Sequence, residues 1–237
     1  MEHFNAFIDD LRSSHGKNLV SVVLYGSAAA GDYVPRRSDH NILVVLEKIG
    51  PDDLRLAHAA SREWNRIGNP TPVYFTASEI QNAGDVFPIE FHQMKTARRV
   101  LYGPDLLAGV EISGSFLRLQ TEFELRSKLI RLRRRYISVS TSPDALVSLM
   151  VESISSFAAL FRAVLILNGI DPPATKHEIV ALTSKHIGIS NEPFEKIFDI
   201  RENKSSEAID ESSANRLFGE YITQIEGVID AVDRLEK

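Results

Sequence analysis

The sequence predicts an α+β fold, in which a segment of alternating strands and helices precedes an all-helical segment. Two observations carry this prediction. Short β-branched apolar runs at 19–25 and 41–46, bounded by Gly, Pro and polar residues, are typical of buried strands. From about residue 113 the apolar residues recur at helical spacing instead. We therefore predict two domains, 1–110 and 111–237.

The remaining elements of the first domain follow from local signals. A third strand is predicted at 72–76, and weaker strand signals stand at 87–91 and 99–102. Pro51 opens a helix that is expected to run to about Ile67. A short helix is expected to begin at Ser78-Glu79-Ile80.

The second domain is predicted to be a helical bundle. Its first helix carries apolar residues at helical spacing, among them Leu125, Leu129, Leu132 and Tyr136. Ser142-Pro143 begins the next helix, because Pro is favoured at the first helical position. That helix is apolar around most of its girth up to Asn168-Gly169, which predicts a central position in the bundle.

Two further helices of the bundle have recognisable ends. Thr175 and Glu178 have the spacing of a capping box, and Gly188 is a helix stop signal. The apolar stripe of the last helix runs from Leu217 to Leu235. The serine-rich stretch 201–213 is expected to be a loop.

Composition excludes several classes of function. The 237 residues contain no cysteine, so disulfides, thiolate zinc sites and cysteine nucleophiles are all excluded. The net charge of −5 makes nucleic acid an unlikely partner. The first residues lack the charged and apolar regions of a signal peptide, and the longest apolar run, 157–167, is short for a membrane span and contains Arg162. We expect a cytoplasmic protein with no membrane partner.

One motif points to a specific chemistry. The first strand ends at Gly26-Ser27, eleven residues ending in Ser38 follow, and Asp39 then opens the second strand, in the segment LYGSAAAGDYVPRRSDHNILVVL. Over about its first hundred residues the chain resembles the polymerase-β-like nucleotidyltransferases, whose signature is a strand, Gly-Ser, a spacer and Ser-Asp-x-Asp. The later stretch FPIEFHQMKTARRVLYGPDLL resembles bacterial members in which a helical bundle follows, as in the kanamycin nucleotidyltransferase plan.

The resemblance implies a small mixed β-sheet packed against the helical bundle, with the nucleotide in the cleft between the two halves. In this family a hydroxyl attacks the α-phosphorus of a nucleoside triphosphate, and Mg²⁺ neutralises the charge that develops. The residues implied for nucleotide binding are Gly26, Ser27, Arg36 and Ser38. Asp39 is implied as the catalytic residue. Asp39 and Asn41, two positions apart on one strand, would face the same side and hold the metal.

The acidic part of the signature is depleted. The position that should carry the second carboxylate is Asn41, whose amide can bind a cation but brings no charge. The strand at 72–76 has no carboxylate where the family has its third. Glu79 and Glu90 are the nearest acidic residues that could substitute for it. Two of three expected metal carboxylates are thus missing, and whether the chain is an enzyme stays open.

Three functions are consistent with this pattern. The first is a catalytically impaired nucleotidyltransferase that still binds a nucleoside triphosphate. The second is an active, Mg²⁺-dependent transferase that modifies a small molecule or a protein, with Glu79 or Glu90 as the third acid. The third is a non-enzymatic interaction protein that dimerises through its bundle. Intact Gly26-Ser27 favours the first two, and the missing acids favour the first over the second.

Other charged and aromatic residues have simpler interpretations. The basic run at Lys128, Arg131 and 133–135 is interpreted as a solvated helix face, paired in part with Glu122 and Glu124, rather than as an anion site. His40 is expected on the strand face opposite to any metal. No zinc spacing or HEPN-type RNase spacing of histidines is present, and Trp64 is interpreted as a packing residue.

Overall fold

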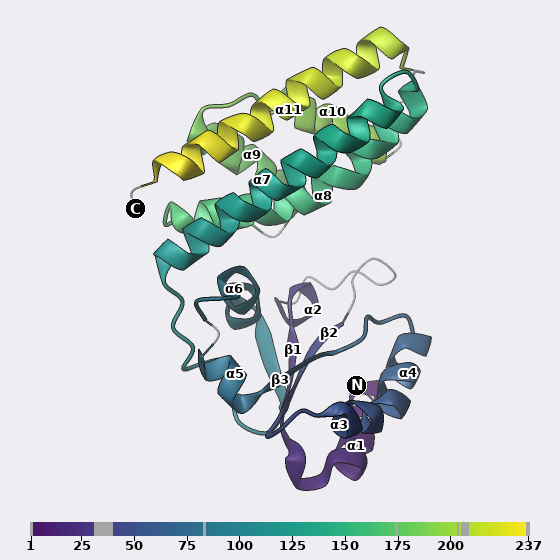
Figure 1. The fold of residues 1–237 in the computed structure, drawn as a ribbon, viewed down its shortest axis with the longest axis vertical. Helices are drawn as coiled ribbons and strands as arrows, with labels where there is room; N and C mark the ends of the chain where they lie inside the picture. Colours follow the sequence, from purple (N-terminus) through teal and green to yellow (C-terminus); the bar gives the residue numbers. More distant parts are fainter. Residues whose placement is uncertain are drawn as a thin grey trace. The chain divides into compact units, whose positions relative to one another are not determined.

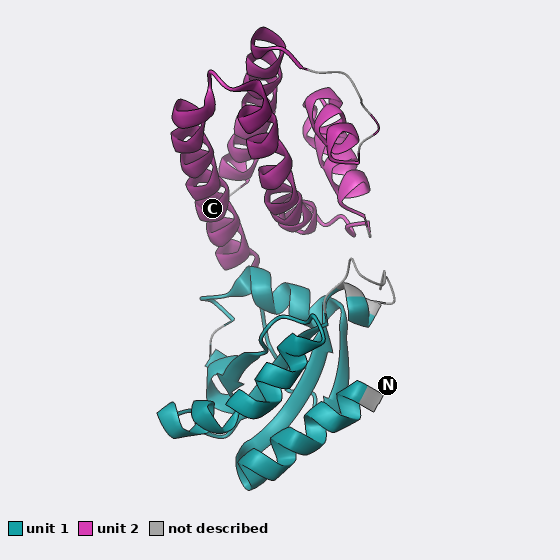
Figure 2. Ribbon diagram, turned by 90° about the vertical axis from the view of Figure 1, so that its right-hand side faces the viewer, with its two compact units in different colours: residues 1–113 teal, residues 114–237 magenta. Residues whose placement is uncertain are grey.

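A computed structural model describes residues 2–30, 40–82, 84–173, 175–202, 204 and 209–235. The chain divides into two compact units, Met1–Ser113 and Gly114–Lys237, which are coloured separately in Figure 2. The predicted boundary at residue 110 lies three residues before the observed one.

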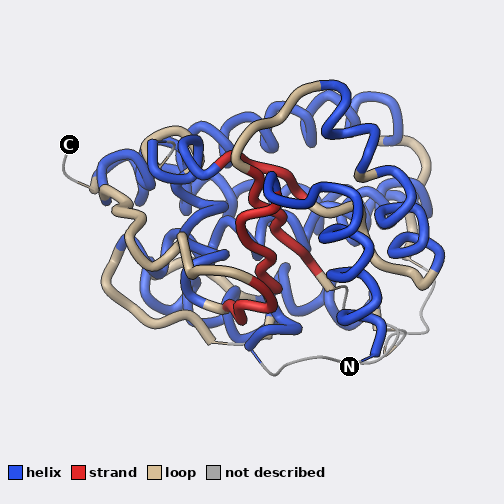
Figure 3. The backbone as a smooth tube through the Cα atoms, turned by 90° about the horizontal axis from the view of Figure 1, so that it is seen from below, coloured by secondary structure: helices blue, strands red, loops and turns tan. Residues whose placement is uncertain are grey.

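The N-terminal unit contains a four-stranded mixed sheet in the order β3-β2-β1-β4 (Figure 1). The strands, which form one group (Figure 3), are β1 Leu19–Tyr25, β2 Asn41–Leu46, β3 Val73–Thr76 and β4 Arg98–Tyr102. β1 pairs antiparallel with β2 and β4, whereas β2 pairs parallel with β3. The predicted small mixed sheet is therefore confirmed.

Helices cover both faces of this sheet, because the central strands are apolar on both sides (Figure 1). The elements are α1 Glu2–His15, the 3₁₀ turn η1 Gly16–Asn18, α2 Ser27–Ala30, α3 Pro51–Leu56, α4 His58–Arg66, α5 Ala77–Asn82 and α6 Pro88–Thr96. One face packs on α1 and α4, where Trp64 is buried as predicted. The other face packs on α5 and α6 through Ile80, Phe91 and Met94.

Two predictions for this unit are wrong. The segment 87–91, predicted as a weak strand, lies at the start of helix α6. Its apolar residues alternate over five positions, as they would in a strand. Pro88 instead occupies the first turn of a helix that continues to Thr96, and Met94 of this helix packs against the sheet. The single helix expected from Pro51 to Ile67 is divided at Ala57 into α3 and α4.

The C-terminal unit is a bundle in which one helix contacts all the others. Its helices are α7 Gly114–Val139, α8 Pro143–Leu167, α9 Lys176–Ile187, α10 Glu192–Arg201 and α11 Glu211–Arg234. α8 packs against α7, α9, α10 and α11, so its predicted central position is confirmed. The apolar run 157–167 was expected to be too short to cross a membrane, whereas the whole of α8 is long and apolar enough to do so. However, 56% of its most apolar stretch is buried inside the protein.

The predicted helix ends of α9 are confirmed. The Glu178 amide donates to Thr175 Oγ1 (3.2 Å), and the Thr175 amide and hydroxyl both donate to the Glu178 carboxylate. Gly188 ends the helix with φ of +81°, a conformation that suits glycine. Of the loop predicted at 201–213, positions 203 and 205–208 lie outside the described residues.

We expect Thr175→Ala to lower the free energy of unfolding by about 1 kcal/mol, because the first turn of α9 loses its cap. Urea denaturation followed by circular dichroism measures the loss. Thr223→Ala is a matched control, since the Thr223 hydroxyl bonds only a carbonyl of its own helix, that of Gly219. An equal loss in both variants would contradict the capping role.

Candidate functional site

The candidate site begins at the turn where β1 ends. Gly26 follows Tyr25 with φ of +81°, a backbone conformation that a residue with a Cβ adopts only at a cost. Its amide donates to the Ala97 carbonyl (2.9 Å), and its own carbonyl accepts from the Ala29 amide (2.9 Å). These two bonds fix the turn between β1 and α2, which begins at Ser27, and tie it to the residue before β4.

Asn41 lies directly across from this turn. It pairs with Tyr25 at the end of the β1–β2 ladder, and a Cβ atom placed on Gly26 would be 3.4 Å from Asn41 Nδ2. This is an ordinary van der Waals distance, so Asn41 packs closely against the Gly26 turn, and it is the positive φ that favours glycine there. Of the residues predicted from the motif, the structure brings Gly26 and Asn41 together, and Ser27 follows Gly26 as the first residue of α2. Arg36, Ser38 and Asp39 lie outside the described residues.

The two faces of β2 have different surroundings at this end of the strand. His40 contacts Phe4 and Trp64, with ring centroids 5.1 and 6.2 Å away, and its Nδ1 lies 3.0 Å from Asn69 Oδ1. It thus belongs to the α1–α4 face, as predicted. Asn41, one residue on, belongs with Tyr25 to the face that α5 and α6 cover.

Of the two acidic residues considered as substitutes for the third carboxylate, Glu90 is the one that lies near this end of the sheet. It lies in the first turn of α6, one residue before Phe91, which is buried against β1 and β2. Burial raises the pKa of the Tyr25 phenol, and the negative charge of Glu90 raises it further. Because Tyr25 pairs with Asn41, Glu90 acts electrostatically on the site.

Glu79, the other acidic residue considered from the sequence, lies at the opposite end of the sheet. β3 runs parallel to β2, with Val73 level with Leu43 and Thr76 level with Leu46. Five residues of extended strand separate Asn41 from Leu46, about 17 Å at the usual rise. The Glu79 carboxylate also accepts hydrogen bonds from the Thr76 amide (2.7 Å) and hydroxyl (3.0 Å) at the start of α5. Its role is to cap that helix.

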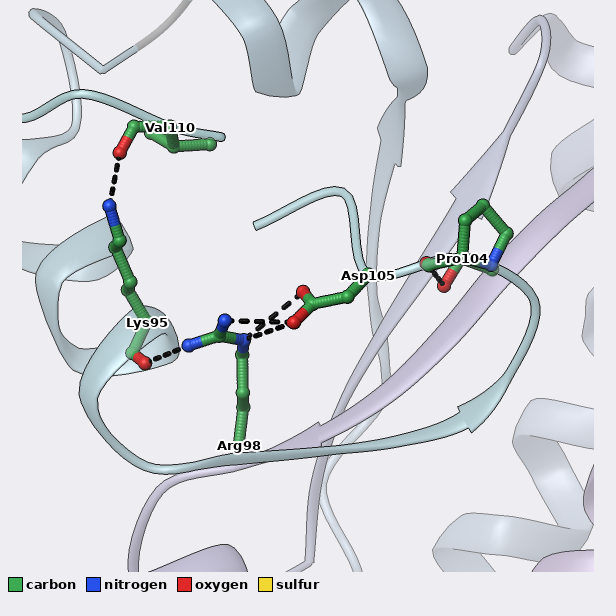
Figure 4. Close-up of polar contacts among 6 residues, drawn as sticks. Lys95, Arg98, Pro104, Asp105 and Val110 are labelled. Carbon is green, nitrogen blue, oxygen red and sulfur yellow. Dashed lines mark hydrogen bonds and ion pairs between the residues drawn. The ribbon is translucent and has the colours of Figure 1, made fainter. Parts of the chain in front are cut away.

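Hydrogen bonds and an ion pair connect Lys95, Arg98 and Asp105 where α6 meets β4 (Figure 4). Ala97, whose carbonyl accepts from the Gly26 amide, directly precedes Arg98. Arg98 forms a bidentate ion pair with Asp105, with distances from 2.8 to 3.1 Å, and also donates to the Lys95 carbonyl. The Lys95 ammonium donates to the Val110 carbonyl (2.6 Å). Hydrogen bonding to Arg98 lowers the pKa of Asp105. Lys95 and Arg98 thus have structural partners.

The described donors do not fit a two-metal cage. Such a cage requires several carboxylate oxygens, whereas this end of the sheet presents the Asn41 amide and the Glu90 carboxylate. By the register of β3, the positions level with Asn41 and Ile42 are Thr71 and Pro72, and neither is acidic. Within the described ranges, no group of three or more His, Cys, Asp or Glu residues could hold a metal ion.

Two residues of the basic run on α7 form ion pairs with neighbouring helices. Arg133 pairs with Glu226 of α11 (2.5 Å) and Arg135 with Glu152 of α8 (2.8 Å). This agrees with a solvated face rather than an anion site. The predicted partner Glu122 pairs instead with Arg118 and Arg126, which precede the run.

Sequence reasoning missed two parts of the site. Tyr25 was treated only as the end of a strand, although it stands directly before Gly26-Ser27. The anchor at Ala97 could not be found from sequence, because it depends on β4 pairing with β1 some seventy residues earlier in the chain.

Comparison with known proteins places this fold. No protein-family model matches the chain, and a search of curated proteins gives no match. Among solved structures, the chain is similar to the spectinomycin adenyltransferase AAD(9) from Enterococcus faecialis, whose crystal structure contains ATP and spectinomycin. The match covers 97% of this chain and 98% of that one, with a TM-score of 0.59 and 15% sequence identity. The α+β nucleotidyltransferase fold predicted from the sequence is therefore confirmed.

Proposed function

We propose that this chain binds a nucleoside triphosphate in its N-terminal unit, at the sheet end where Gly26 leaves β1 and Asn41 begins β2, and that its transferase activity is weak or lost. The observation that carries the proposal is the Gly26 turn. Its positive φ, its bond to Ala97 and its fit against Asn41 keep an open, fixed backbone at the position where the fold family holds phosphates.

The likeness in fold supports the same site. The similar adenyltransferase binds ATP together with a small acceptor, and its fold extends over both units of this chain. At 15% identity the comparison supports the fold alone, so the nucleotide, and a small-molecule or protein acceptor, remain part of the proposal. Ser27, Arg36 and Ser38 are the residues that we propose to contact phosphate oxygens.

The chemistry of the donors favours binding over catalysis. Magnesium would supply charge neutralisation at the transferred phosphate in an active member of the fold. An amide at position 41 brings no negative charge, but its NH₂ group can donate a hydrogen bond to a phosphate oxygen, which a carboxylate cannot do. Asn41 is thus suited to hold an anion directly, with Asp39 as the single acid of the motif.

Residual catalysis is the second candidate, and the position of Glu90 favours it. Glu90 contributes negative charge at Tyr25, the partner of Asn41 in the ladder. A carboxylate there could accept the proton of an attacking hydroxyl. Glu79 has no part in this candidate, because it lies at the far end of β3.

Isothermal titration with ATP, GTP, CTP and UTP, each with and without Mg²⁺, tests the binding proposal. We expect saturable binding of at least one triphosphate, weakened roughly 3- to 10-fold in Ser27→Ala by the loss of one phosphate hydrogen bond. Asp39→Ala should remove any Mg²⁺ dependence. Ser14→Ala on α1 is the matched control, because the Ser14 hydroxyl bonds carbonyls of its own helix.

The outcomes separate the candidates. Binding that is independent of Mg²⁺ supports a nucleotide-binding protein. Binding that requires Mg²⁺, with release of pyrophosphate that Glu90→Gln abolishes, supports residual transfer. If none of the four triphosphates binds at millimolar concentration, both candidates are wrong.

A further inference from the structure

Helix α7 has a second apolar face that the bundle does not use. Its buried face consists of residues such as Leu125, Leu129 and Leu132, which pack into the unit. A further set of large apolar side chains on the same helix is between 44% and 77% exposed. They are Phe116, Leu119, Phe123, Ile130 and Ile137.

These exposed side chains form one stripe, here called the outer stripe. Phe116, Phe123, Ile130 and Ile137 are spaced by seven residues, and Leu119 falls one turn after Phe116. At 100° per residue the five lie within a narrow arc on the side of α7 opposite the buried leucines. Among the described residues of the C-terminal unit, every exposed large hydrophobic side chain belongs to this stripe. The concentration on one face distinguishes it from scattered surface apolar residues.

The four residues of the outer stripe that are spaced by seven are self-complementary in an antiparallel pair, in which Leu119 is level with Arg134 of the partner subunit. An antiparallel pair of α7 helices with a two-fold axis between positions 126 and 127 sets Phe123 against Ile130 of the partner subunit. The same axis sets Phe116 against Ile137 of the partner subunit, because these two positions lie equally far from the axis along the helix. The stripe spans about 32 Å at 1.5 Å per residue. Residues spaced by seven supply one of the two apolar positions of each heptad along a helix–helix seam, and the second position is Leu119 once and then Arg126 and Arg133.

Charge along one edge of the stripe favours the antiparallel orientation. Glu124 lies in the first half of α7 and Arg131 in the second, on the same side of the stripe. In the part of the chain that the structure describes, neither forms an ion pair. An antiparallel pair would bring Glu124 beside Arg131 of the partner subunit, twice. A parallel pair would place the arginines of the second half side by side.

The other edge of the stripe is already neutralised within the chain. Arg126 pairs with Glu122 (2.8 Å) and Arg133 with Glu226 (2.5 Å). These pairs remove the repulsion that two basic helices would otherwise bring to the contact.

We infer that this protein associates with a second copy of itself through the outer stripe of α7, as an antiparallel helix pair centred on positions 126 and 127. The inference does not depend on nucleotide binding. It rests on the apolar stripe, its two-fold symmetry and the reciprocal charges on its edge.

Sedimentation velocity of the full chain tests the association. We expect a dimer at micromolar concentration, and a roughly tenfold or larger loss of affinity in Phe123→Glu, since Phe123 is central to the contact. Leu54→Glu is the matched control, because Leu54 is also an exposed apolar helix residue, at 48%, but lies on α3. A wild-type monomer at all concentrations, or equal loss in the control, would overturn the inference.

Two further experiments test the register. Glu124→Arg and Arg131→Glu should each weaken the dimer, and the double variant should restore it, which a folding defect would not do. The chain has no native cysteine, so single cysteines report contacts cleanly. Ser127→Cys should cross-link to itself under mild oxidation, whereas Phe116→Cys should cross-link only when mixed with Ile137→Cys. Self-linking of Phe116→Cys instead would indicate a parallel pair and overturn the proposed geometry.

Discussion

Replacing Gly103 by alanine should destabilise the N-terminal unit by about 3–5 kcal/mol, the range of severe overpacking and backbone strain combined. Gly103 ends β4 with φ of +73°. A Cβ atom there would lie 2.0 Å from the Val20 carbonyl oxygen and 3.1 Å from Ser21 Cα, both of which belong to the backbone of β1. No side-chain rotation relieves such a contact, so β4 would have to move away from β1.

The same movement would break the bonds that close this corner of the sheet. The Ser21 hydroxyl is buried and donates to the Tyr102 carbonyl (3.0 Å) and the Pro104 carbonyl (2.8 Å). A shifted β4 would also displace Ala97, which anchors the Gly26 turn. We therefore expect Gly103→Ala to lose nucleotide binding together with stability.

Tryptophan fluorescence during urea unfolding measures this loss in the N-terminal unit alone. The chain has one tryptophan, and Trp64 is buried in the core between the sheet, α1 and α4. Gly109→Ala is the matched control, since a Cβ there meets nothing within 4 Å. A loss below about 1 kcal/mol in Gly103→Ala would mean that the β1–β4 contact adapts more easily than its backbone atoms suggest.

Local patterns were sufficient for the elements that are buried along their whole length. β1 and β2 were predicted from unbroken apolar runs, and the central helix α8 from apolar residues around most of its girth. The segment 87–91 was assigned to the wrong class because five residues satisfy both periodicities, and the helix is identified only by its continuation to Thr96.

The site was predictable only where its residues are close in sequence. Gly26 and Asn41 meet because consecutive strands pair, so the motif was enough to bring them together. The choice between Glu79 and Glu90 depends on the direction of β3 and on the packing of α6, which no local pattern encodes. For the same reason the periodicity of α7 predicted its buried leucines, whereas the outer stripe became visible only when the bundle identified the uncovered face.

Restoring carboxylates should convert the site to magnesium-dependent nucleotide binding. Asn41→Asp supplies an acid two positions after Asp39 on the same strand face. Val73→Glu supplies a second one on β3, because Val73 is level with Leu43 on the face that Asn41 shares, and its 38% exposure tolerates a charge. We expect the double variant to bind a triphosphate with Mg²⁺ roughly 10- to 100-fold more tightly than the native chain does.

The expected change in triphosphate affinity has the opposite sign when Mg²⁺ is absent. Two added negative charges repel a triphosphate, so in the absence of Mg²⁺ the double variant should bind more weakly than the native chain. Titration calorimetry with and without Mg²⁺ measures both changes. Asn82→Asp with Val86→Glu adds the same charges at exposed positions of α5 and the following turn, and should change neither affinity. If the metal has no effect on the Asn41→Asp/Val73→Glu variant, Asn41 does not occupy the position of the missing acid. The Gly26 turn would then bind its anion by backbone and amide donors alone.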